Sequence, residues 1–101
     1  MIEDDIRAAL RDTKVPGDGS TVRVLGFAQR TGKNSRCICR LRLFGETKLD
    51  LEVHVLAETV ADRMDRYNDL KDWLLGQIQL WLMRPASERG TLLRILPGTR
   101  V

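Results

Sequence analysis

The chain has 101 residues, of which 43% are hydrophobic and 31% charged, with a formal net charge of +3. This length allows one domain with one core over residues 1–101, and the composition excludes a disordered or fibrous chain as the main description. No stretch approaches the roughly 20 apolar residues of a membrane-spanning helix. The first residues are acidic, whereas a secretory signal would begin with basic residues. We therefore expect a soluble, cytoplasmic protein.

The N-terminal residues predict a short amphipathic helix followed by a strand. Within residues 2–11 the apolar side chains recur at helical spacing, and acidic residues occupy the first turn, where the helix dipole favours them. A segment rich in Gly and Pro, residues 15–20, ends the helix. Residues 21–28 are rich in Val and Leu and predict the first strand.

The next two strands show the clearest alternation in the chain. Residues 36–44 and 49–56 alternate apolar and polar side chains, so each strand has one inward face. A loop of residues 45–47 brings inward residues opposite one another. This register predicts three cross-strand pairs, which are Arg42 with Asp50, Arg40 with Glu52 and Ile38 with His54.

The following segment predicts one long helix and a last strand. Thr59 and Asp62 form a near capping box, and Pro85 ends the helix near Met83 or Arg84. The residues expected on its sheet-facing side are Val60, Met64, Tyr67, Leu70, Leu74, Ile78, Trp81 and Leu82. Residues 91–96 predict the final strand. The expected fold is a single α+β domain of order α-β-β-β-α-β, with an antiparallel meander sheet covered by one long amphipathic helix.

The end of the long helix carries more apolar surface than one sheet needs. Trp73, Gly76, Leu80 and Met83 lie opposite the sheet-facing side at spacings of 3, 4 and 3. Trp and Met are favoured at protein interfaces, and Gly76 would permit close approach of a partner. The alternative is that the N-terminal helix or the last strand covers this side as ordinary core.

The residues that carry enzyme or metal chemistry are few. Cys37 and Cys39 lie on one strand face and predict two free core thiols, while the only histidine, His54, is expected on the opposite, solvent-exposed face. Two cysteines are too few for a structural zinc site, and no catalytic triad can be assembled. We therefore expect no enzyme activity, no metal, no cofactor and no small-molecule substrate.

Nucleic-acid binding is the alternative function. Residues 21–45 carry a net charge of +6, and Arg30, Lys33 and Arg36 at the hairpin tip could contact phosphates. The order of elements is similar to that of the double-stranded RNA-binding domain. The similarity is one of order alone, because that family has a lysine-rich start to its second helix and residues 57–62 are acidic here.

Together these patterns favour a small non-enzymatic protein-binding module, as an assembly, adaptor or inhibitor component. The expected partner is another copy of the chain or a different protein, bound through the long helix. Self-association as a homodimer is the specific expectation.

Overall fold

A computed structural model describes residues 2–30, 36–89 and 92–95. The elements, in chain order, are α1 (Ile2–Leu10), β1 (Thr21–Arg30), β2 (Arg36–Phe44), β3 (Lys48–Leu56), α2 (Ala57–Asp65), α3 (Leu70–Leu82), the 3-10 turn η1 (Ala86–Glu88) and β4 (Leu92–Ile95). The α+β class is confirmed.

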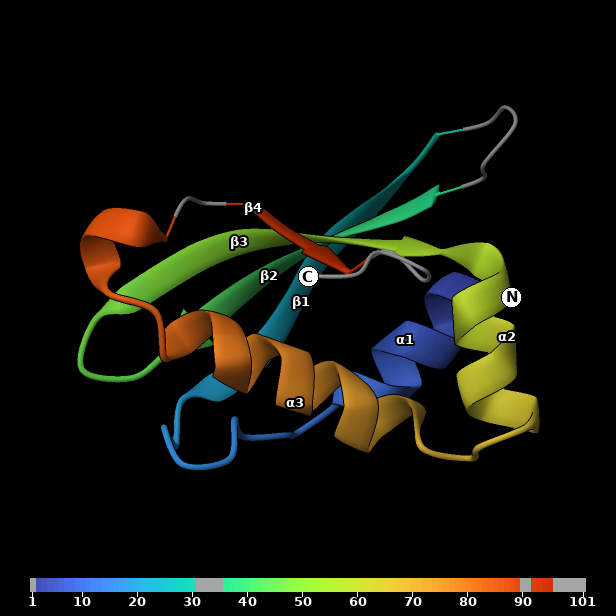
Figure 1. The fold of residues 1–101 in the computed structure, drawn as a ribbon, viewed down its shortest axis with the longest axis horizontal. Helices are drawn as coiled ribbons and strands as arrows, with labels where there is room; N and C mark the ends of the chain where they lie inside the picture. Colours follow the sequence, from blue (N-terminus) through green and yellow to red (C-terminus); the bar gives the residue numbers. More distant parts are fainter. Residues whose placement is uncertain (1, 31–35, 90–91, 96–101) are drawn as a thin grey trace.

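The first three strands form the expected antiparallel meander. The pairs Arg42 with Asp50, Arg40 with Glu52 and Ile38 with His54 all occur, so the register predicted from strand parity and loop length is confirmed. The sheet order is β1-β2-β3-β4 (Figure 1).

The last strand pairs in parallel with β3, which departs from an all-antiparallel sheet. A parallel neighbour needs a long crossover connection, and α2 and α3 supply it. As a result β3 is an interior strand, and within the described sheet β1 and β4 are its two edges.

Helices α1 and α3 lie on the same face of the sheet (Figure 1). The inward side chains of the strands meet Ile6 and Leu10 of α1 and Leu74 and Ile78 of α3, all almost fully buried. This two-layer packing follows from the apolar stripes of both helices and the one apolar face of the sheet.

The single long helix of the sequence analysis is wrong, because the structure divides it into α2 and α3. The break lies at residues 66–69, where Asn68 has a positive φ of 51°. The Tyr67 N–H donates to Asp62 O at 3.0 Å, and the Asp69 N–H donates to Arg63 O at 2.8 Å. Asn tolerates this left-handed conformation, which ends a helix.

Two further details of the helix prediction are corrected. Because the helix breaks, Met64 and Tyr67 do not continue the sheet-facing stripe, and they are 39% and 54% exposed. The capping box is also absent: α2 begins at Ala57 after Leu56, which makes no side-chain cap bond, and Thr59 lies inside the helix.

No helix in the described part of the chain combines the length and apolarity needed to cross a membrane.

Candidate protein-binding surface

The C-terminal half of α3 and its cap residue expose two large apolar side chains. Leu80 is 59% exposed and Met83 is 73% exposed. Helical periodicity places them on the side opposite the buried Leu74 and Ile78, which pack on the sheet. The two residues expected at an interface therefore lie on open surface in the single chain.

Trp73 occupies the other end of the same stripe and is half-buried. Its ring packs against the core, and the Arg63 guanidinium lies 5.1 Å from the ring centroid. Arg63 also stacks on Tyr67 at 4.6 Å and donates a hydrogen bond to Asp69 Oδ2 at 2.9 Å. These contacts hold the exposed edge of Trp73 at the corner between α2 and α3.

Gly76 forms a gap in the stripe between Trp73 and Leu80. A Cβ placed there would meet no atom within 4 Å other than those of its own chain neighbours and helix backbone. The gap is therefore open space that a side chain from outside could enter. We call the set Trp73, Gly76, Leu80 and Met83 the α3 stripe.

The α3 stripe carries no charge along its length. Residues 73–83 contain no ionisable side chain, in a chain that is 31% charged. Exposed charges of opposite sign flank this segment, with Asp72 before it and Arg84 after it. Such a surface fits an apolar partner better than a polyanion.

Two basic residues of β2 are paired with acidic residues of β3. Arg42 Nε lies 2.7 Å from Asp50 Oδ1, and Arg40 Nε lies 3.3 Å from Glu52 Oε2. The hydrogen bond from Arg42 lowers the pKa of the Asp50 carboxyl below its ordinary value. These two arginines are therefore engaged within the sheet.

The alternative nucleic-acid site falls at the β1–β2 hairpin tip. The backbones of Arg30 and Arg36 face each other at the ends of their strands. Lys33 and the side chains of Arg30 and Arg36 lie outside the described residues, so this site stays a prediction.

His54 lies on the predicted face of the sheet, opposite the side of the cysteines, but it is 5% exposed rather than solvent-exposed. It lies on the interior strand β3, with Ile38 of β2 opposite it and β4 paired on its other side. Its Nε2 lies 3.4 Å from Glu52 Oε1.

Cys37 and Cys39 are free and buried. Burial, the main cause, raises the pKa of Cys37 to about 11 and that of Cys39 to about 12. Thiols with such pKa values stay protonated at neutral pH, so they are poor nucleophiles and poor metal ligands. Within residues 2–30, 36–89 and 92–95, no group of three or more His, Cys, Asp or Glu side chains is placed to hold a metal ion.

Sequence reasoning did not single out Arg7 and Arg11, which line a hollow beside β1. Their spacing of four residues on the polar side of the first helix was the available signal. Only the packing of α1 beside the sheet shows that they border the same strand as Arg23.

Comparison with protein-family models, curated proteins and solved structures finds no match to this chain.

Proposed function

We propose that this protein is a protein-binding module that associates with a second copy of itself through the α3 stripe. The observation that carries the proposal is an exposed apolar surface, Leu80 and Met83, on a helix segment without charge. Contiguous exposed apolar side chains on one helix mark interaction sites more often than single scattered ones do.

The spacing of the α3 stripe makes it complementary to itself in an antiparallel arrangement. A two-fold axis at the level of Ile78 would bring Trp73 opposite Met83 of the second copy and Gly76 opposite Leu80. The Leu side chain would fill the gap at Gly76. The Met sulfur would meet the Trp ring, a favourable contact.

The flanking charges obey the same two-fold arrangement. Asp72 and Arg84 are also equally distant from Ile78, so each would face its opposite charge on the second copy. They lie near opposite ends of α3, roughly 18 Å apart at the helical rise, and cannot pair within one chain. Parallel helices would instead bring like charges together at both ends. The antiparallel homodimer is therefore the arrangement that the charges favour.

The proposal includes a cytoplasmic location for the protein. Two unpaired thiols persist in a reducing compartment, which supports a cytoplasmic location. A dimer carries two copies of each surface outside the α3 stripe, so it could hold two partner molecules together in an assembly or adaptor role.

The experiment is a measurement of molar mass by light scattering or sedimentation over a range of protein concentrations. The wild type should approach twice the monomer mass as concentration rises. Leu80→Glu should weaken dimerisation by at least about tenfold, because it introduces a charge at the centre of both stripes. Met64→Glu, on another exposed apolar residue, is the matched control and should leave dimerisation unchanged.

A charge exchange tests the antiparallel geometry directly. Asp72→Arg and Arg84→Asp should each weaken dimerisation by about two- to tenfold, and the double variant should recover it. Gly76→Leu should fold as a monomer, because the single chain has room for the side chain, and should not dimerise. A wild type that stays monomeric at all concentrations would contradict the proposal.

A further inference from the structure

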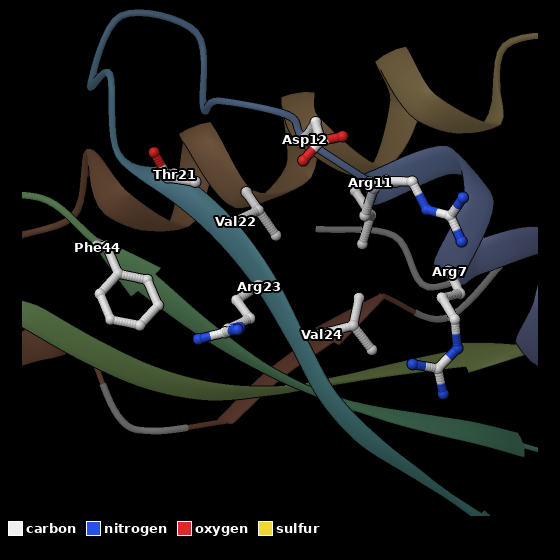
Figure 2. A pocket seen from close by; sticks show the side chains of 9 residues that line it. Arg7, Arg11, Asp12, Thr21, Val22, Arg23, Val24 and Phe44 are labelled. Carbon is white, nitrogen blue, oxygen red and sulfur yellow. The ribbon is translucent and has the colours of Figure 1, made fainter.

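A groove of about 610 Å³ runs beside β1 where α1 ends (Figure 2). Its floor is apolar, formed by the buried Leu10 and Val22 and the half-buried Val24. Its rim is basic, with the exposed Arg7, Arg11 and Arg23 against a single acidic residue, Asp12. The groove is separate from the α3 stripe, and its chemistry is different.

Among the described residues, β1 is an edge strand of the sheet, and the groove lies along this edge. Residues 13–15 pair with only the first part of β1: the Val22 N–H donates to Thr13 O at 3.0 Å, on the side away from β2. Because backbone groups of alternate residues point to the same side of a strand, the N–H and C=O of Val24 also point away from β2, as far as the register shift between Val24 and Gly26. Val24 therefore directs one backbone donor and one backbone acceptor toward the position that another strand would occupy.

The arginines border both sides of this edge. Figure 2 shows Arg7 and Arg11 on the α1 side of β1, and Arg23 with Phe44 on the other side. Arg7 is held near the strand, with its guanidinium 5.1 Å from the Phe27 ring centroid. A strand added to β1 would alternate its side chains between these two sides, so it would meet positive charge on both.

The positive charge of the rim determines which kind of strand can bind at the β1 edge. A second copy of β1 would bring Arg23 near its own equivalent, and like charges on adjacent strands repel. A nucleic acid has no backbone groups matching a strand edge, and three arginines offset by Asp12 offer few phosphate contacts. An extended acidic peptide satisfies the edge, the apolar floor and the basic rim together.

We propose that the β1 edge and the arginines Arg7, Arg11 and Arg23 bind an extended acidic segment of a different protein by strand addition. Backbone bonds to Val24 align the segment, and charge-assisted hydrogen bonds from the arginines select glutamate or aspartate side chains. The proposal does not depend on dimerisation through the α3 stripe.

The probe is a fluorescent, end-blocked peptide that alternates glutamate and valine, with anisotropy as the readout. Replacing Arg7 and Arg11 by Gln should raise the Kd at least about fivefold, because two charge-assisted contacts are lost. Arg40→Gln with Arg66→Gln is the matched control. It removes the same charge from exposed arginines outside the groove and should change the Kd less than about twofold.

Strand addition has its own test on unchanged protein. The same peptide N-methylated along its centre keeps its charges but cannot donate backbone hydrogen bonds, and it should not bind. Equal binding of the methylated peptide would overturn the proposal, as would an equal loss in the control variant. Tighter binding of single-stranded DNA that depends on the same arginines would also overturn it, in favour of a nucleic-acid site.

Discussion

The two cysteines of β2 show how a residue's position in a strand determines its chemistry. Both side chains point into the layer between the sheet and the helices, where Cys37 is 2% and Cys39 1% exposed. Burial disfavours the thiolate, so both pKa values rise from 9.0, to about 11 and about 12. These thiols are part of the core, and they couple its stability to alkaline pH.

We predict that the protein loses stability above pH 9. The unfolded chain releases the thiol protons near pH 9, whereas the folded chain holds them to about pH 11 and 12. Their contribution is complete below pH 9 and disappears as pH rises through those higher values. At pH 10 the loss is about 1.4 kcal/mol per thiol.

Denaturant titration of the wild type and of Cys37→Ala with Cys39→Ala, at pH 7 and pH 10, measures this effect. The variant is less stable at both pH values because it loses packing, so the slopes with pH are compared. The slope of the variant should be shallower. Identical slopes would show that the buried thiols do not couple folding to pH.

At the scale of the element, the break between α2 and α3 depends on few residues. Asn68 adopts φ 51°, and Asp69 accepts a hydrogen bond from Arg63 at 2.9 Å. The break allows α3 to pack on the sheet, while α2 lies beside the C-terminal end of β3 (Figure 1). One continuous helix could not follow both directions.

The conformation of Asn68 gives a direct prediction. Asn68→Ala should destabilise the fold by about 1 kcal/mol. Ala has a Cβ, which is strained in the left-handed conformation, and lacks the Asn amide that can hydrogen-bond locally. Asn68→Gly should cost less than about 0.5 kcal/mol or stabilise. Ala61→Gly, on the exposed side of α2, is the control and should cost about 1 kcal/mol. Thermal unfolding of the three variants checks this order, and an equal cost for Ala and Gly at position 68 would contradict it.

At the scale of the whole molecule, α1, α3 and the sheet meet at one point. A void too small for a water molecule lies there, and the residues lining it are Ile6, Leu10, Cys39, Leu41, Val53, Val55, Leu74 and Ile78. Ile78 is fully buried, whereas Leu80, two residues later, is 59% exposed. One helix therefore packs on the core with one side and exposes Leu80 on the other.

Shortening single side chains distinguishes the buried side of α3 from its exposed side. Ile78→Ala should lower the free energy of unfolding by about 2–5 kcal/mol, and Ile78→Val by about 0.5–1.5 kcal/mol. Leu80→Ala should cost less than about 0.5 kcal/mol when measured in dilute protein. Chemical denaturation gives all three values. A cost for Leu80→Ala as large as that for Ile78→Ala would mean that Leu80 belongs to the core.

The register of β2 and β3 could be predicted because it depends on local features. Alternation with period two, a three-residue loop and two opposite-charge pairs agree on one pairing, and a slip by one residue would expose every apolar side chain. The helix break had a local signal in Asn68 and Asp69. It was missed because the apolar periodicity continues almost unbroken across it.

By itself the sequence determined the α+β class, the antiparallel meander with its register, and the uncharged stripe on α3. Only the tertiary structure decided that β4 pairs in parallel with β3, that His54 is buried, and that Arg7 and Arg11 join Arg23 along one strand edge. The reason is physical. Periodicity and loop length act between neighbours in the chain, whereas a final strand pairs with whichever edge the folded chain leaves open, and helix packing determines which charges border the other edge.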